Sequence, residues 1–353
     1  MRLLTIVAFS LVAMPPGFAQ TAGNAGPGLP KDPRAIFALA DPSYDFNSPE
    51  LRPWHLKANY QIYDEKGKPS EQGTYEYWWA SPKVYRSTWT RQNATHSDWH
   101  TAEGKHAYLA TGERLGLFEY KLQNDLLSPI PRIADLDPSK FRLERESVSS
   151  GGVKFPCIMV IPVLPMHGQL QTEPLGLYPT YCFDPKLPVL RTSYSFGTVT
   201  TEFNNVVEVQ KKYLPREILY FDGKREIFSA TIDAVTPLKP SDPAFTPAES
   251  ATVAKADQAE VSAGVAAGML LKKQAPDYPL DAKNASFSGN VTLEAIIGTD
   301  GGVHDLRVLA SPMPSLADSA LWAVSNWEYK PYLQDGEPVE MKTTVDVFFS
   351  FTR

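Results

Sequence analysis

The segment HSDWH places His96, Asp98 and His100 at alternate positions of a stretch that has the period-2 pattern of a strand. Alternate residues of a strand share one face. Two imidazoles and a carboxylate would then lie side by side, as in a metal site of a metal-dependent hydrolase. His106, beyond a turn predicted at Gly104, would add a fourth ligand. A solvated polar face explains the same pattern, and we favour that interpretation over a metal site.

Other catalytic patterns are missing from the sequence. It contains no Gly-x-Ser-x-Gly nucleophile elbow, no Walker loop and no His-Glu-x-x-His helix. We therefore expect a protein that is not an enzyme and that uses no cofactor.

The first residues are typical of a secretory signal. Arg2 supplies the positive charge, residues 3–13 are apolar, and small residues precede a cleavage site near Gln20. The apolar run is shorter than the roughly 20 residues needed to cross a bilayer. We expect residues 1–20 to be removed and residues 21–33, rich in Gly, Ala and Pro, to form a disordered leader. A weak membrane anchor formed by an uncleaved segment is the lesser alternative.

The two cysteines would then lie in an oxidising compartment. Cys157 and Cys182 flank a proline-rich stretch between two strand-like runs, which favours a disulfide between them. A zinc or nucleophilic role is the alternative, but Cys157 lies in the apolar run KFPCIMVIPV without ligands at suitable spacing. We expect a structural disulfide.

Length and charge limit the classes of protein. The 353 residues, 43% of them hydrophobic, suffice for two domains of ordinary size. The formal net charge is −6 and the basic residues are dispersed, so we expect no nucleic-acid binding.

Residues 34–238 alternate aromatic or β-branched residues with polar ones, which predicts a large antiparallel sheet. Turns are expected at residues 64–68, at Gly104 and at Asp222–Gly223. Helices are expected only at residues 32–40, 128–136 and 138–144. Residues 239–260, polar and rich in proline, read as a linker between two domains.

Residues 261–353 predict a smaller domain. Its expected order is helix, strand, strand, helix, strand, giving a three-stranded antiparallel sheet with two helices and an overall α+β fold class. The last strand, from Val339, alternates apolar and polar residues and should be buried on one side.

Several short motifs in this second domain resemble the C-terminal domain of the TonB energy transducers. They occur in the expected order: Tyr278-Pro279; Gly289, Val291 and Leu293; Asp300, Gly301 and Val303; Trp327, Tyr329 and Pro331; and Gly336, Pro338 and Val339. The resemblance extends over residues 261–353.

This resemblance implies a periplasmic adaptor associated with transmembrane transport. In that family the domain binds a short peptide of outer-membrane receptors by adding it as a strand to the sheet edge. The partner would be a peptide segment of an outer-membrane receptor or of a periplasmic protein. The residues that would contact it lie in the final strand and in the segment before the first helix: Lys342, Thr344, Val345, Asp346, Phe348, Gln274, Tyr278 and Pro279.

The sequence departs from the family's pattern in three ways. It has no lasting N-terminal anchor, no Pro-Glu/Pro-Lys spacer, and an acidic C-terminal domain. These differences put energy coupling to the inner membrane in doubt. A homodimer formed by pairing of the exposed final strands is an open alternative.

The N-terminal domain loosely resembles the lipoprotein-carrier (LolA-like) fold, an incomplete barrel around an apolar cavity. Tyr75, Tyr77 and Trp79 fall on one strand face and Glu76 and Trp78 on the other, so a bulky side chain lies opposite the core. That side chain would belong to a wall facing a ligand, and the protein would then be a carrier of lipid or another apolar ligand. A two-layer β-protein, with helices covering the second face, is the alternative.

Overall fold

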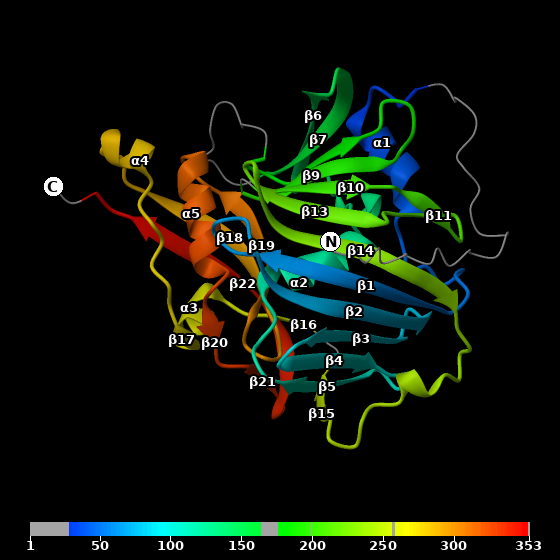
Figure 1. Cartoon of the computed structure of the whole chain (residues 1–353). Helices are drawn as coiled ribbons and strands as arrows, with labels where there is room; N and C mark the ends of the chain where they lie inside the picture. Colours follow the sequence, from blue (N-terminus) through cyan, green and yellow to red (C-terminus); the bar gives the residue numbers. More distant parts are fainter. Residues whose placement is uncertain (1–27, 164–175, 198, 256–257, 352–353) are drawn as a thin grey trace, which may run out of the picture.

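The computed structural model describes residues 28–163, 176–197, 199–255 and 258–351 of the chain (Figure 1). The predicted signal at residues 1–20 and most of the predicted leader lie outside the described residues. No helix within the described ranges is long and apolar enough to span a membrane.

Most of the chain before residue 256 forms one antiparallel sheet (Figure 1). It contains thirteen strands in the spatial order β15-β5-β4-β3-β2-β1-β14-β13-β10-β9-β8-β7-β6, and it is open because β15 and β6 stand at its two ends. The strands are β1 (Trp54–Tyr63), β2 (Pro69–Ser81), β3 (Val84–Arg91), β4 (Ala94–His100), β5 (Lys105–Thr111), β6 (Phe141–Ser150), β7 (Val153–Pro162), β8 (Thr180–Phe183), β9 (Leu190–Phe196), β10 (Val199–Asn204), β13 (Glu217–Asp222), β14 (Arg225–Pro237) and β15 (Thr252–Lys255). The predicted antiparallel β-rich fold is confirmed.

The predicted turns and the predicted disulfide are present. The turns at residues 64–68, at Gly104 and at Asp222–Gly223 join β1 to β2, β4 to β5, and β13 to β14. A separate hairpin is formed by β11 (Val207–Val209) and β12 (Lys212–Leu214). Cys157 of β7 lies opposite Cys182 of β8, and their sulfurs are bonded. The disulfide therefore joins neighbouring strands of the sheet.

One face of the sheet carries the large aromatic side chains. Tyr75, Tyr77 and Trp79 are buried on this face, and their rings pack with those of Trp54 and Trp89. The predicted alternation along β2 is confirmed.

Of the three helices predicted at residues 32–40, 128–136 and 138–144, only the first is present. Helix α1 (Pro33–Ala40) begins at Asp32, whose carboxylate accepts a hydrogen bond from the Arg34 amide, as the sequence predicts. Residues 128–136 form only a short 3-10 turn, η2 (Ile133–Asp135), since prolines at 129 and 131 remove backbone donors. Residues 138–144 were wrongly predicted as helical, because residues from Phe141 onward belong to β6, paired with β7 along its whole length.

Helix α2 (Leu117–Leu127) has no counterpart among the predicted helices. Its apolar residues are mixed with polar residues that are also buried, so the usual amphipathic pattern is weak. The Glu119 carboxylate accepts hydrogen bonds from the Gly116 amide at 2.6 Å and from the Tyr60 hydroxyl at 2.7 Å. Burial raises the pKa of Glu119 above its usual value.

The C-terminal part builds a second sheet in the order β16-β22-β18-β19, with β21 also paired to β22. Its elements are β16 (Gln258–Glu260), α3 (Ala263–Gly268), α4 (Leu280–Asn284), β18 (Gly289–Ile297), β19 (Val303–Ala310), α5 (Pro314–Val324), β21 (Tyr332–Gln334) and β22 (Glu337–Phe349). A two-stranded pair, β17 (Leu270–Lys272) with β20 (Glu328–Tyr329), accompanies it. The three predicted antiparallel strands are β19, β18 and β22, which form the centre of this sheet. Strands β16 and β21 and the short helix α3 were not predicted.

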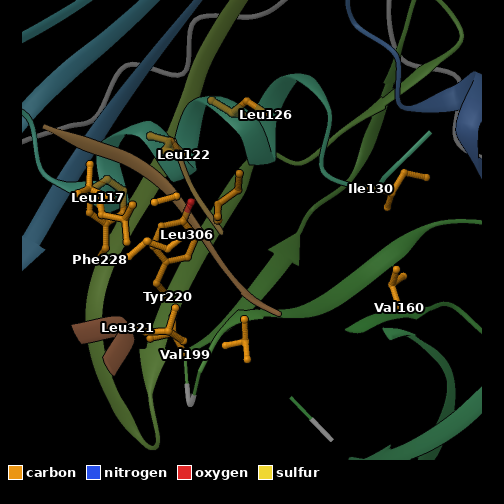
Figure 2. Close-up of a cluster of buried hydrophobic side chains, with 14 of the residues drawn as sticks. Leu117, Leu122, Leu126, Ile130, Val160, Val199, Tyr220, Phe228, Leu306 and Leu321 are labelled. Atoms are coloured by element: carbon orange, nitrogen blue, oxygen red, sulfur yellow. The ribbon is translucent and has the colours of Figure 1, made fainter. Parts of the chain in front are cut away.

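The two parts share one hydrophobic core. Figure 2 shows Leu306 of β19 and Leu321 of α5 in one cluster with Leu117 of α2 and with Tyr220 and Phe228 of the large sheet. The C-terminal part therefore packs against the aromatic face of the large sheet and against α2.

The predicted linker, residues 239–260, contains two strands. β15 pairs with β5 at the end of the large sheet, and β16 pairs in parallel with β22 of the second sheet. Residues 239–260 therefore contribute an edge strand to each of the two sheets. The division of the chain into domains on either side of these residues stays a prediction.

Candidate partner-binding edge

Strand β22 is paired on one side along most of its length. Its residues 341–349 lie opposite residues 289–297 of β18. Residues 337–339 pair with β21, and on the side away from β18 residues 340–342 pair with β16. Helix α3 also contacts the strand. Residues 343–349 have no strand on this second side within the described parts of the chain. We call this stretch the free edge.

The direction of each backbone group along the free edge follows from one hydrogen bond. The carbonyl of Lys342 accepts from the Val261 amide at 2.9 Å, on the side away from β18. Because both backbone groups of a strand residue point to the same side and alternate along the strand, those of Thr344, Asp346 and Phe348 point toward the free edge. A peptide strand added there would pair with these three residues.

Val345 differs in orientation from the other predicted contact residues of β22. Its side chain is buried in the core, it faces Leu293 of β18, and by the same alternation its backbone groups point to β18. Val345 therefore supports the sheet, and a substitution there would disturb the core as well as the edge.

The side chains on the outer face of β22 are exposed or half-buried. Phe348 is 76% exposed, the largest exposed fraction among the exposed large hydrophobic side chains in the described parts of the chain. Asp346 accepts hydrogen bonds from Asn290 and from Thr292, the latter at 2.7 Å, and Lys342 lies 3.3 Å from Glu294. Asp346 and Lys342 are thus held by side chains of β18, whereas the Phe348 side chain is exposed.

The predicted contact residues that precede α4 lie in two different places. The Tyr278 ring packs edge-on against Phe349 at 5.8 Å between centroids, which places it at the end of β22. Gln274 and Pro279 line an open pocket of about 770 Å³ beside α5, and the Gln274 carbonyl accepts from the Trp327 indole at 2.8 Å. The structure therefore brings Tyr278 to the strand and places Gln274 and Pro279 on the flank of α5.

Two motifs of the C-terminal domain contact each other through Gly301 and Tyr329. Gly301 has a φ of +80°, and a Cβ there would lie 2.0 Å from the Tyr329 carbonyl oxygen. The Tyr329 amide donates to the Gly301 carbonyl at 2.8 Å, so the turn after β18 and the chain after α5 are locked together. Trp327 is buried, as expected of a core residue.

The predicted histidine motif does not form a cluster of ligands. His96 Nε2 lies 2.6 Å from the Glu113 carbonyl oxygen, and Asp98 pairs with His106 at 3.0 Å. The His100 ring stacks between Tyr85 and His106. Among the described residues, no group of three or more His, Cys, Asp or Glu side chains is arranged to hold a metal ion.

His100 and His106 instead line a polar cavity of about 290 Å³ between the two parts, together with His304 and Glu340 of the C-terminal part. Burial lowers the pKa of His100 to about 4, with a further contribution from the neighbouring His106. His304 pairs with Asp300 at 3.0 Å. Burial acts to lower the pKa of His304, but the hydrogen bond and charge of Asp300 outweigh it and raise the pKa above its usual value.

The ion pair with His304 lowers the pKa of Asp300. Burial acts to raise the pKa of this carboxyl, but His304 and the Gly302 amide together hold the pKa well below its usual range. The contact between the two parts of the chain therefore contains a partly buried ion pair.

The aromatic face of the large sheet is filled with side chains. Tyr60, Tyr75, Trp89 and Tyr220 are each no more than 3% exposed, and α2 covers them. Trp78, on the opposite face, stacks on His55 at 4.6 Å and lies under the Arg86 guanidinium. The aromatic face is thus packed against α2, and Trp78 on the opposite face is half-buried.

Two features of the site escaped the sequence analysis. The segment Gln258–Glu260 is too short and polar to show a strand pattern, although it covers part of the edge of β22. The packing of α2 on β19 joins elements far apart in the chain, and no local pattern reports such a contact.

Comparisons with known proteins concern both parts of the chain. Residues 274–351 match the family model described as Gram-negative bacterial TonB protein C-terminal. The solution structure of the Pseudomonas aeruginosa TonB C-terminal domain is 27% identical, with 24% of this chain and 86% of that chain covered and a TM-score of 0.22. The comparison with curated proteins found no match.

Two other solved structures overlap a larger share of the chain. A LolA superfamily protein from Nitrosomonas europaea is 10% identical, with 61% of this chain and 97% of that chain covered and a TM-score of 0.37. A DUF1329 family protein from Desulfovibrio piger is 10% identical, with 59% and 94% covered and a TM-score of 0.36.

The family match falls on the motifs described above and includes β18, β19, α5 and β22. The predicted resemblance is confirmed for this part, and residues 274–351 are identified as a TonB-type C-terminal domain.

Proposed function

We propose that the protein is a periplasmic TonB-like adaptor that binds a peptide segment of an outer-membrane or periplasmic protein by strand addition. The observation that carries this proposal is the free edge of β22, residues 343–349, within a domain that matches the TonB C-terminal family. An unpaired edge presents a row of backbone donors and acceptors that an extended peptide can use.

The geometry limits the length of the bound strand. Because β16 pairs with residues 340–342 on the side away from β18, a strand that pairs with the free edge has only residues 343–349 of β22 available. The exposed Phe348 would supply an apolar contact to the added strand.

A proline variant tests the backbone contribution. Asp346→Pro removes a backbone amide that points to the free edge, so the hydrogen bonds between β22 and β18 keep all their donors. Asp346→Ala is the matched control, because it removes the same side-chain contacts with Asn290 and Thr292 and keeps the amide. We expect the alanine variant to retain partner binding and the proline variant to lose it.

The measurement uses a photocrosslinking amino acid at position 348, with the peptides joined to it identified by mass spectrometry from cells. The same crosslinker at Val153, an exposed position of β7 in the large sheet, reports nonspecific capture. Equal crosslinking of one partner peptide by wild type and by Asp346→Pro, both folded, would contradict strand addition at this edge.

A further inference from the structure

The polar cavity between the two parts of the chain has the features of a small-ligand site. Its volume of about 290 Å³ lies close to the lower end of the range for such pockets. Strands β3 and β4 contribute Tyr85, Ser87 and His100, and the C-terminal part contributes Thr299 and Glu340. None of these residues belongs to the free edge, so the cavity is a separate site.

Two buried hydroxyl groups of this cavity have no hydrogen-bond partner. Ser87 is 5% exposed and Thr299 is 9% exposed, and neither side chain makes a hydrogen bond among the described residues. Both oxygens keep accessible surface, in contrast to the enclosed hydroxyl of Thr201. Because a buried polar group without a partner is unfavourable, a molecule in the cavity that pairs with both would be stabilised.

Tyr85 and His100 add further polar atoms without partners. The His100 ring stacks between Tyr85 and His106, with 4.2 Å and 4.8 Å between centroids. Neither the His100 nitrogens nor the Tyr85 hydroxyl make a hydrogen bond within the described parts of the chain. Burial lowers the pKa of His100 to about 4, so at neutral pH the ring is uncharged and has one donor and one acceptor nitrogen.

Most charged groups around the cavity are already paired with each other. Asp98 lies 3.0 Å from His106, and Asp300 lies 3.0 Å from His304. The Asp98 side chain is 37% exposed, so the cavity is open to solvent at this wall. The polar groups left for a ligand are therefore mainly neutral.

Glu340 is the charged group that keeps a free atom. One of its carboxylate oxygens accepts from the Gln258 side-chain amide, and the other has no hydrogen-bond partner in the described structure. A carboxylate oxygen accepts from hydroxyl groups, and its charge opposes the binding of an anion.

We propose that this cavity binds a neutral polyhydroxylated molecule of about the size of one hexose. A hydroxyl group donates and accepts, as do the unpartnered hydroxyls of Ser87 and Thr299 and the neutral His100 ring. An ammonium group only donates and a carboxylate only accepts, so neither can pair with this set as completely. Binding here goes beyond the proposed adaptor function and does not depend on strand addition.

Isothermal titration of the chain without its predicted signal, residues 1–20, tests the proposal. The probes are glucose, galactose and mannose, with choline as a small cation and succinate as a small anion. We expect saturable binding of one molecule of at least one hexose, at least about tenfold tighter than that of choline or succinate. If none of the three hexoses binds, the cavity holds only water and the proposal is overturned. Binding of choline or succinate as tight as that of the best hexose overturns it as well.

Two variants locate the binding. Ser87→Ala removes one unpartnered hydroxyl and is expected to weaken binding of the best hexose about fivefold. His100→Phe keeps an aromatic ring in the stack and removes both nitrogens, so it is expected to weaken binding about tenfold or more. Circular dichroism checks that each variant folds.

Each variant has a matched control on the opposite face of the sheet. Ser97 is also 5% exposed but bonds to Thr88 at 2.9 Å, and His55 stacks on Trp78 at 4.6 Å between centroids. Ser97→Ala and His55→Phe should therefore bind the hexose as wild type does. Unchanged binding in either folded cavity variant refutes the site, and so does an equal loss in its control.

Discussion

The imidazole of His304 lies flat on the ring of Tyr120, with 3.6 Å between their centroids, and joins the C-terminal sheet to helix α2 of the N-terminal part. His304 is held there by its ion pair with Asp300. The TonB-type domain is therefore attached to the large sheet by specific contacts as well as by its shared core.

The His304–Asp300 pair predicts a pH-dependent contribution to stability. The pKa of His304 is raised on folding, so its contribution is complete below the unfolded value of about 6.5 and is lost as the pH rises through the folded pKa. The pKa of Asp300 is lowered, so its contribution is present above the unfolded value of about 3.9 and is lost at more acidic pH. The pair contributes most between these two values.

We expect His304→Gln to lower the free energy of unfolding by about 2 kcal/mol near pH 5 and by about 1 kcal/mol or less at pH 9. Urea unfolding of both proteins at the two pH values measures this difference. Effects of other titrating groups, such as His100, cancel between wild type and variant. A difference that is equal at both pH values would show that the ion pair contributes nothing.

The shared core predicts that the two parts unfold together. Leu306 of β19 is 3% exposed and packs among residues of α2 and the large sheet, so Leu306→Ala should cost about 2–5 kcal/mol. Leu333→Ala, at a side chain that is 52% exposed, should change stability by less than about 0.5 kcal/mol. Calorimetry should show one transition that moves to lower temperature in Leu306→Ala. Two transitions, only one of which moves, would mean that the parts are energetically independent.

Two glycines with similar backbone angles should differ in their tolerance of alanine. Gly301 has a φ of +80° and a Cβ there would meet the Tyr329 carbonyl, so Gly301→Ala should cost about 3 kcal/mol or more. Gly336 has a φ of +86° but open space around it, so Gly336→Ala should cost only about 1 kcal/mol. Denaturant midpoints at constant slope measure both values. Similar costs for the two variants would show that the contact with Tyr329 has no energetic role.

The disulfide should stabilise the far end of the large sheet. Replacing both Cys157 and Cys182 with serine is expected to reduce the free energy of unfolding by about 3 kcal/mol, mainly by releasing a constraint on the unfolded chain. Wild type unfolded in the presence of a thiol reductant provides the comparison and should show a similar loss. Identical unfolding curves with and without the bond would exclude this contribution.

The sequence predicts the parts of the fold that depend on local patterns. The alternation in β2 and β22 and the turns at Gly104 and Asp222–Gly223 follow from side-chain period and backbone freedom, and the structure contains them. The disulfide followed from the two cysteines and their flanking strands.

The sequence fails where distant contacts determine the structure. Helix α2 buries Glu119 and Asp125, whose hydrogen-bond partners Tyr60 and Tyr220 come from remote strands. Because these buried residues are polar, the sequence of α2 lacks the apolar stripe by which a buried helix face is recognised. Phe141 was expected in a helix, yet its pairing with Pro162 of β7 places it in a strand. At the candidate edge, the exposed residues were predictable, but the partial cover by β16 was not.

That partial cover affects how the protein behaves at high concentration. A fully open edge of β22 would offer a long template on which a second copy, or an unfolded chain, could nucleate an intermolecular sheet. By laying Gln258–Glu260 along residues 340–342, the chain shortens this template and leaves a stretch that ends at the exposed Phe348. The segment thus reduces the length of β22 on which intermolecular pairing could begin to residues 343–349.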